Sequence, residues 1–270
     1  MPKQIPFYKM VASGNDFIVI DNRKRLIKDP IVFTRKICAL HTGIGADGVL
    51  LFENSQKADF KMRIINSDGS EAEACGNGFR CIALYACEKL DYPKEFEFES
   101  ISGRIHARVG QNQRVQVQLV RPSEVRLRSE IQVMGHRLHY SFLNTGVPHT
   151  VILVEGLDKI DVLALGRAIR FHDDFKPRGT NVNFIEVKSP KEIQVRTYER
   201  GVENETLACG TGSTASAIAS SLLGYTKPPV AVKTSGGEIL TVDFKRDGDR
   251  VTETTLEGEV HFVYEGKLEL

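Results

Sequence analysis

Two stretches of this 270-residue chain carry the same cysteine–glycine signature: Glu71-Ala72-Glu73-Ala74-Cys75-Gly76-Asn77-Gly78 and Glu205-Thr206-Leu207-Ala208-Cys209-Gly210-Thr211-Gly212. When the sequence is slid against itself by the separation of the two cysteines, the first glutamate, the alanine, the cysteine and both glycines coincide. The same offset places residues 17–21 on residues 151–155. A constant offset across separated segments indicates an internal duplication.

Each copy repeats one order of elements. A strand is followed by a helical stretch, a glycine loop, two strands, the cysteine loop and a second helix. Further strands follow with period-two alternation, as in residues 114–119. We therefore predict an α+β fold of two pseudo-symmetric domains, residues 1–125 with Cys75 and residues 126–258 with Cys209. Residues 259–270 are expected to add a strand that returns to the N-terminal domain.

The composition is that of a globular protein and excludes several functions. Hydrophobic residues make up 41% and charged residues 26%, and the net charge of +1 provides no basic face for nucleic acid. No apolar run approaches the roughly 20 residues that span a bilayer, and residues 1–7 lack the pattern of a secretion signal. We expect a cytoplasmic protein that binds neither nucleic acid nor membrane. A homodimer remains open.

The five cysteines are odd in number and irregularly spaced. No Cys-x-x-Cys pair is present, which disfavours a zinc site, a disulfide scaffold and the commonest redox motif. His136 and His139 come closest to a metal-ligand pair, but in a strand this spacing points them to opposite faces. We expect no metal, and we expect Cys38, Cys81 and Cys87 to be small helical residues without a chemical role.

Cys75 and Cys209 differ from the other cysteines because each opens onto Gly-x-Gly and a helix. A helix start leaves about four backbone N–H groups unpaired and carries partial positive charge. These groups favour an anion such as a substrate carboxylate, and they lower the pKa of a nearby thiol. One such cysteine alone is better interpreted as buried and inert, whereas two in the same frame favour function.

Two thiols on opposite sides of a cleft suit the inversion of a stereocentre. One thiolate removes a proton from one face, and one thiol delivers a proton to the other face. The α-proton of an amino acid is a very weak acid, so N–H groups and a desolvated site must stabilise the carbanion without pyridoxal phosphate or a metal. We therefore interpret the protein as a cofactor-independent amino-acid racemase or epimerase acting on a small-molecule substrate.

Motifs along nearly the whole chain resemble those of the diaminopimelate epimerase family. They are Lys9-Met10, Gly14-Asn15-Asp16-Phe17, Gly43-Ile44-Gly45-Ala46-Asp47-Gly48, Asn66-Ser67-Asp68-Gly69-Ser70, Pro148-His149, Gly179-Thr180-Asn181-Val182-Asn183-Phe184, Tyr198-Glu199-Arg200-Gly201 and the two cysteine loops. The resemblance implies interconversion of LL- and meso-diaminopimelate, on the lysine and peptidoglycan route, without a cofactor. It also implies that each domain is a barrel-like, mostly antiparallel sheet around a central helix.

The same resemblance implies roles for individual residues. Cys75 and Cys209 are the proton-transferring residues, and His149 and Glu199 help to set the protonation of the thiols. The implied substrate contacts are Asn15, Asn66, Gly76, Asn77, Asn181, Glu199, Arg200, Gly210 and Thr211. These residue types fit the substrate, because asparagine can bind both ammonium and carboxylate groups and arginine can bind a carboxylate in a forked geometry.

Two positions depart from the family pattern, and three alternatives stay open. Val147 stands where many relatives have asparagine before Pro-His, and Gly48 stands where some carry glutamine. The first alternative is the same chemistry on another amino acid, such as a proline-type substrate. The others are a thiol redox protein and a non-catalytic amino-acid-binding protein, which would bind its ligand without changing optical rotation.

Overall fold

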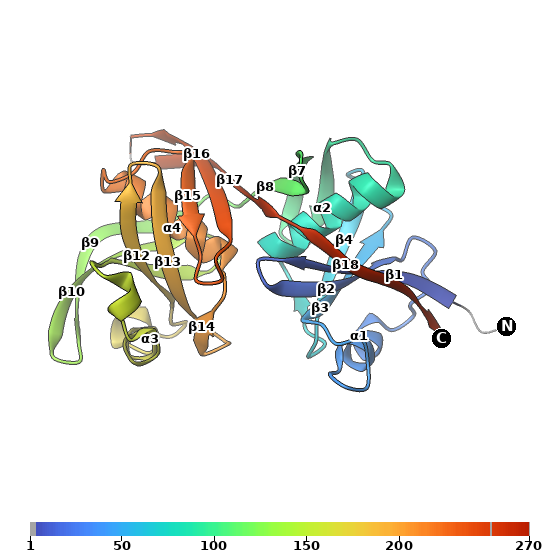
Figure 1. Ribbon diagram of the computed structural model, residues 1–270, viewed down its shortest axis with the longest axis horizontal. Helices are drawn as coiled ribbons and strands as arrows, with labels where there is room; N and C mark the ends of the chain where they lie inside the picture. Colours follow the sequence, from blue (N-terminus) through green and yellow to red (C-terminus); the bar gives the residue numbers. More distant parts are fainter. Residues whose placement is uncertain (1–3, 249, 270) are drawn as a thin grey trace. The chain divides into compact units, whose positions relative to one another are not determined.

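The computed structural model describes residues 4–248 and 250–269, and these divide into two compact units (Figure 1). Unit 1 contains the described residues up to Gln118 together with those from Gly258 onward, and unit 2 is Leu119–Glu257. The sequence predicts a division after residue 125. The boundary lies earlier because β9 (Ser123–Val133) pairs with β10 (His136–Asn144) and because Leu119 N donates to the carbonyl of Thr254, so residues 119–125 join the second unit.

Unit 1 is built from strands that run in the hydrogen-bonded order β18-β1-β2-β3-β4-β6-β7-β8. The β2–β3 and β4–β6 pairs are parallel and the others are antiparallel. The elements are β1 (Gln4–Ala12), β2 (Asn15–Asp21), α1 (Pro30–Cys38), β3 (Gly48–Glu53), β4 (Phe60–Asn66), β5 (Glu71–Ala72), α2 (Gly76–Leu90), β6 (Glu95–Ser100), β7 (Gly103–Val109), β8 (Arg114–Gln118) and β18 (His261–Glu269).

Unit 2 repeats this order as β9-β10-β11-β12-β13-β15-β16-β17, with parallel pairs at the same two places. The further elements are β11 (Pro148–Leu153), α3 (Val162–Arg170), β12 (Asn181–Ser189), β13 (Glu192–Glu199), β14 (Asn204–Thr206), α4 (Gly210–Leu222), β15 (Val230–Lys233), β16 (Ile239–Asp247), β17 (Arg250–Glu259) and the 3-10 turns η1 (Leu157–Lys159) and η2 (Asp173–Phe175). The duplication predicted from the cysteine loops is therefore a duplication of strand order.

Each unit encloses one helix. Helix α2 contacts β1, β2, β3, β7 and β8, and α4 contacts β10, β11, β12, β13, β15 and β16. Ten residues of α2 and ten of α4 are buried, so each helix is enclosed on all sides rather than along one stripe. The predicted fold, two pseudo-symmetric α+β domains with a mostly antiparallel sheet around a central helix, is confirmed.

The outer helices α1 and α3 cover the opposite face of the same strands. Both begin with an aspartate, Asp29 or Asp161, whose carboxylate accepts hydrogen bonds from the first turn. In β3, Val49 and Leu51 pack in one cluster with α1. In β12, Val182 and Phe184 pack in one cluster with α3. Since side chains alternate along a strand, Leu50 and Asn183 point to the inner face.

The strand registers correct the constant offset used to align the two copies. Leu50 pairs with Val19 and Ile64, and Asn183 pairs with Val151 and Thr197 at the matching place of unit 2. Two residues earlier in each strand, Phe17 pairs with Gly48 and His149 pairs with Asn181. Phe17 is thus the counterpart of His149, and Leu50 is the counterpart of Asn183. The alignment of residues 17–21 with residues 151–155 was out of register.

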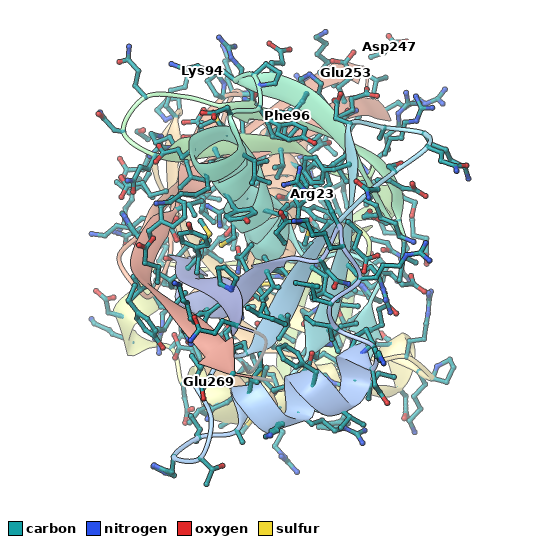
Figure 2. The ribbon with its side chains drawn as sticks, turned by 90° about the vertical axis from the view of Figure 1, so that its right-hand side faces the viewer. Arg23, Lys94, Phe96, Asp247, Glu253 and Glu269 are labelled. Carbon is teal, nitrogen blue, oxygen red and sulfur yellow. The ribbon has the colours of Figure 1, made fainter. Side chains whose placement is uncertain are left out.

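Unit 1 also contains an aromatic cluster that fixes β3, β4 and β6 beside α2. The rings of Phe52 and Phe60 are stacked 4.2 Å apart, and Phe96 lies 5.6 Å from Phe60. Arg23 lies 5.3 Å from the Phe52 ring centroid. Arg23 and Phe96 are labelled in Figure 2. Among the described residues, none of the helices is both long and apolar enough to cross a membrane.

Candidate active site

Cys75 and Cys209 occupy the same structural position, the residue that precedes the first turn of a buried helix. Both have extended backbones, with φ −152° and ψ 112° at Cys75 and φ −128° and ψ 109° at Cys209. The carbonyl of each accepts the first helical hydrogen bond, from Phe79 N or Ser213 N at 2.8 Å. Each thiol therefore lies beside the N–H groups and the positive end of a helix, as the duplicated motif predicts.

The second glycine of each loop is required by close packing against the inner face of the sheet. A Cβ atom on Gly78 would lie 3.2 Å from the Leu50 side chain and 3.7 Å from Cys75 Cβ. A Cβ on Gly212 would collide with Asn183 Oδ1 and lie 3.3 Å from Cys209 Sγ. The absence of a side chain at Gly78 and Gly212 lets the thiol-bearing turn approach the strand.

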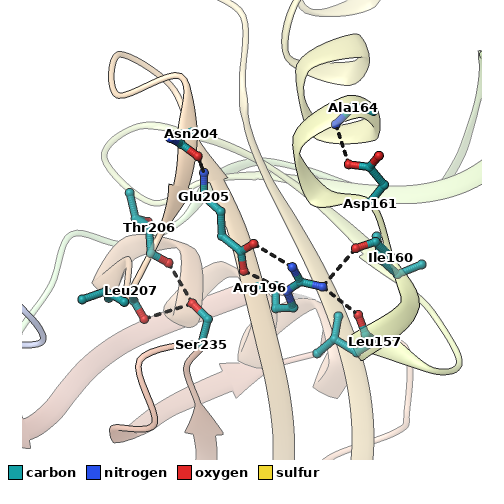
Figure 3. A network of polar contacts seen from close by, with 10 residues as sticks. All are labelled: Leu157, Ile160, Asp161, Ala164, Arg196, Asn204, Glu205, Thr206, Leu207 and Ser235. Atoms are coloured by element: carbon teal, nitrogen blue, oxygen red, sulfur yellow. Dashed lines mark hydrogen bonds and ion pairs between the residues drawn. The ribbon is translucent and has the colours of Figure 1, made fainter.

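A matching ion pair stabilises the strand pair before each cysteine. Arg63 holds Glu71 through two hydrogen bonds of 2.7 and 2.9 Å, and Arg196 holds Glu205 through two of 2.8 and 2.7 Å. Arg196 also donates to the carbonyls of Leu157 and Ile160 at 3.1 and 3.0 Å (Figure 3). Bidentate pairs of this kind are geometrically specific, and they join β4 to β5 and β13 to β14 directly before the cysteine loops.

In unit 1, the thiol of Cys75 lies 3.7 Å from Asn15 Oδ1. Asn15 is held in turn, because its Nδ2 donates to Asp47 Oδ2. Asp47 also accepts from the backbone N–H of Asp16 at 3.1 Å. The structure thus brings together Asn15 and Cys75, two of the expected site residues, and adds Asp47 as the residue that orients the asparagine.

Asn77 is oriented by a buried arginine. Arg80 is 0% exposed, and its Nη2 donates to Asn77 Oδ1 at 2.7 Å and to Ser13 Oγ at 2.6 Å. Because the oxygen of Asn77 accepts from Arg80, its Nδ2 remains as the hydrogen-bond donor in the first turn of α2. Asn66 is placed differently: it ends β4 and donates to Ser70 Oγ at 3.0 Å, within its own turn.

In unit 2, a chain of polar contacts leads to Cys209. The thiol lies 3.5 Å from Thr211 Oγ1, and Thr211 Oγ1 lies 3.0 Å from His149 Nε2. His149 Nδ1 lies 3.1 Å from Asn183 Nδ2. Thr211 is further fixed because its backbone carbonyl accepts from Thr145 Oγ1 at 3.0 Å. The structure therefore connects three of the predicted residues, Cys209, Thr211 and His149, and adds Asn183.

Two ionisable groups of unit 2 are shifted toward their neutral forms. Burial, aided by the positive charge of Arg200, lowers the pKa of His149 to about 3, so the imidazole is neutral at physiological pH. Burial raises the pKa of the Glu199 carboxyl, and a hydrogen bond with Thr206 partly opposes this rise. Both shifts follow from desolvation, which penalises the charged form of either group.

The side chain of Asn181 is hydrogen-bonded to the backbone of Arg200. Asn181 Nδ2 donates to the carbonyl of Pro148 at 3.0 Å, and its Oδ1 accepts from Arg200 N at 2.8 Å. The Arg200 side chain donates to the carbonyl of Arg178 at 3.1 Å. Burial and the positive charges of Arg170 and Arg178 lower the pKa of Arg200. A guanidinium in such positive surroundings favours an anion nearby.

Sequence reasoning missed Arg80, Asp47, Asn183 and Thr197. The first three lie within or beside the motifs, and one signal could have singled out Asn183: it is a polar residue at an inward position among five consecutive buried residues of β12. Among the described residues, no cluster of three or more His, Cys, Asp and Glu side chains is arranged to hold a metal ion.

Comparison with known proteins gives one consistent result. The sequence model of the family described as diaminopimelate epimerase matches residues 7–125 and 141–263. The diaminopimelate epimerase of Aquifex aeolicus is 49% identical, with 97% of each chain covered, and that of Hydrogenobaculum sp. is 44% identical, with 96% of this chain and 97% of the relative covered.

Solved structures are similar in fold at low sequence identity. A PhzF-family phenazine biosynthesis protein from Bacillus anthracis has a TM-score of 0.75 at 14% identity, covering 99% of this chain and 100% of that chain. A probable proline racemase from Agrobacterium radiobacter has a TM-score of 0.71 at 15% identity, covering 98% and 93%. At these identities the likeness concerns the fold alone.

Proposed function

Because this chain belongs to the diaminopimelate epimerase family, we propose that it interconverts LL- and meso-diaminopimelate by moving the α-proton between Cys75 and Cys209. The product would serve lysine and peptidoglycan biosynthesis. The observation that carries the proposal is the placement of both cysteines at the start of a buried helix, in equivalent positions of two duplicated units. No cofactor is required.

The proposed reaction is a proton exchange in which both faces of one carbon are used. One cysteine, as the thiolate, takes the α-proton, so a C–H bond breaks and an S–H bond forms. The other cysteine, as the thiol, gives its proton to the opposite face, so that an S–H bond breaks and a C–H bond forms. In the reverse direction the two exchange roles. The mechanism requires both sulfurs to reach the same α-carbon.

The helix starts supply the groups that bind the reacting end of the substrate. The N–H groups of Gly76-Asn77 and Gly210-Thr211 would bind the α-carboxylate, which becomes more basic as the carbanion forms. Asn77 offers its Nδ2 for the same purpose, because Arg80 occupies its oxygen. Electrostatic stabilisation by such pre-oriented donors is the largest single contribution in many enzymes of this kind.

The distal amino-acid end would be bound by Arg200 with Asn15, Asn66, Asn181 and Glu199. Arg200 provides a cation near Arg170 and Arg178, which suits the distal carboxylate. One donor and one acceptor of Asn181 already hold the backbone, so its second N–H is the group that remains for substrate. A substrate with two charged ends fits these residues better than proline does.

The test is incubation of the purified protein with LL-diaminopimelate, with the isomers resolved by chiral chromatography. We expect approach to a mixture of LL and meso forms from either side, without added pyridoxal phosphate or metal. In heavy water, deuterium should enter the product before it enters recovered substrate, since the donating thiol has exchanged with solvent and the abstracting one is shielded. Racemisation of proline but not of diaminopimelate would contradict the proposal.

A further inference from the structure

Asn183 is a buried amide at a position where the other unit has a hydrocarbon. It is 0% exposed on the inner face of β12, and its counterpart in unit 1 is Leu50. A buried amide destabilises the fold unless it is hydrogen-bonded. Asn183 is bonded on both sides: Nδ2 to Thr150 O and His149 Nδ1, both at 3.1 Å, and Oδ1 to Thr197 Oγ1 at 3.0 Å.

The orientation of this amide is fixed by chemistry. The backbone carbonyl of Thr150 can only accept a hydrogen bond, so the atom of Asn183 that faces it must be the NH2 group. Thr197 lies at the opposite atom and can donate its hydroxyl proton to Oδ1. The same NH2 group faces His149 Nδ1. His149 Nδ1 must therefore be the acceptor nitrogen, and the single proton of the neutral ring lies on Nε2.

The tautomer of His149 determines the direction of the next two contacts. With its proton on Nε2, His149 donates to Thr211 Oγ1 at 3.0 Å, and the hydroxyl proton of Thr211 is then available for Cys209 Sγ at 3.5 Å. A hydroxyl that donates to sulfur stabilises the thiolate. With the opposite tautomer, Nε2 would accept from Thr211, whose oxygen would then accept from the S–H group and favour the thiol.

We propose that Asn183 is a positioning residue that fixes the Nε2–H tautomer of His149 and, through Thr211, favours the thiolate form of Cys209. The proposal rests on the proposed function for the role of Cys209 in proton transfer. The neutral state required of His149 agrees with its burial and with the charge of Arg200, which both lower its pKa. In unit 1 the counterparts of His149 and Asn183 are Phe17 and Leu50, so Cys75 has no equivalent of this chain among the described residues.

The test measures the two thiols separately in the full-length protein without substrate. Iodoacetamide alkylation is followed over a range of pH, and mass spectrometry of the peptides gives a midpoint for Cys209 and for Cys75. In Asn183→Leu we expect the Cys209 midpoint to rise by about one pH unit, with alkylation at neutral pH slowed about tenfold. Cys75 serves as the internal control and should keep its midpoint.

A double-mutant cycle shows whether Asn183 acts through His149. His149→Phe introduces the residue of unit 1 and removes the donor to Thr211, so it should raise the Cys209 midpoint by itself. If Asn183 acts only through that ring, Asn183→Leu should add nothing further in the His149→Phe background. Shifts that add, or equal shifts at Cys75 and Cys209, would overturn the proposal.

Two more variants control for changes in the core. Thr197→Val removes the donor to Asn183 Oδ1 while keeping the volume, and it should raise the Cys209 midpoint by less than Asn183→Leu does. If Asn183→Leu fails to fold, the Cys209 midpoint of Thr197→Val tests the proposal in its place. Leu50→Val alters the matching position of unit 1 and should leave Cys209 unchanged. Because alkylation needs no substrate, a protein inactive on diaminopimelate would refute the proposed function without affecting this test.

Discussion

The two units share a frame but surround their cysteines with different chemistry. Both place the thiol at the start of a buried helix and brace the preceding strands with a bidentate arginine–glutamate pair. On the inner face of the sheet, however, unit 1 has Phe17 and Leu50 where unit 2 has His149 and Asn183. The features that position a thiol at a helix start are therefore separable from the side chains that surround it.

The largest effect is expected from removing the feature that both units share, the cysteine at the start of the buried helix. Replacement of either cysteine by alanine should lower epimerisation about a thousandfold or more, because each supplies an acid–base group that nothing else replaces. Cys75→Ala and Cys209→Ala should be equally inactive despite their different neighbours. Turnover is measured from both LL- and meso-diaminopimelate, and circular dichroism checks the fold. Near-normal turnover by either variant would exclude the two-thiol mechanism.

The two units should differ in how their stability depends on pH, because unit 2 has His149 where unit 1 has Phe17. The pKa of this residue falls from 6.5 to about 3 on folding, so between these values the unfolded chain binds a proton that the folded chain does not. Its contribution to stability is complete above pH 6.5 and is lost as the pH falls. At pH 5 the loss should be about 2 kcal/mol.

His149→Phe, which introduces the residue of unit 1, removes this contribution. The loss of unfolding free energy between pH 7 and pH 5, measured by urea denaturation, should be about 2 kcal/mol smaller in the variant. Phe17→Leu is a suitable control, because it alters the matching position without a titrating group. An equal acid sensitivity of wild type and His149→Phe would show that the imidazole is not held neutral.

The two arginine–glutamate pairs should differ in strength. The Arg63 and Arg196 side chains are 25% and 24% exposed, so exposure does not distinguish them. Arg196 makes two further hydrogen bonds, to the carbonyls of Leu157 and Ile160. We expect Arg196→Met to cost about 2 kcal/mol of unfolding free energy and Arg63→Met about 1 kcal/mol. Equal losses in urea denaturation would mean that the bonds to the Leu157 and Ile160 carbonyls contribute nothing.

The smallest effect is expected from a substitution that makes the two units more alike. Val147 precedes His149 by two residues, as Asn15 precedes Phe17, so Val147→Asn restores the side chain found near Cys75. We expect KM for diaminopimelate to fall about threefold with little change in kcat, the effect of one added neutral hydrogen bond. An equal change in kcat and kcat/KM would instead place position 147 among the transition-state contacts.

The repeated cysteine loop was visible in the sequence because both copies keep its residues. The fold followed from it, since helices and alternating strands recur in the same order in both copies. The register of the strands did not follow. The turn between Tyr198 and Glu205 is one residue longer than the matching turn between Ile65 and Glu71. The connection from His149 to its partner Asn181 is also one residue longer than the connection from Phe17 to its partner Gly48. Sliding the chain over itself at one fixed offset cannot show where such extra loop residues lie.

The sequence predicted the motif residues of the candidate site but not the residues that orient them. Cys209, Thr211 and His149 were expected from motifs, and their contacts lie at the start of α4 and the start of β11. Asn183 and Arg80 gain their roles from tertiary neighbours: Thr197 comes from the adjacent strand, and Ser13 from the turn after β1. A charged residue within a helix is ordinarily expected at the surface, so full burial of Arg80 could not be inferred from sequence.

The pairing of β18 with β1 has a consequence for protein synthesis. In unit 2, β9 and β10 are adjacent in the chain and form a hairpin, whereas in unit 1 the same place beside β1 is filled by residues 261–269 (Figure 1). A nascent chain can therefore complete unit 2 before unit 1, although unit 1 is translated first. Until β18 leaves the ribosome, β1 presents an open edge, the kind of surface that chaperones shield. The first thiol loop to be made is the last to gain a finished scaffold.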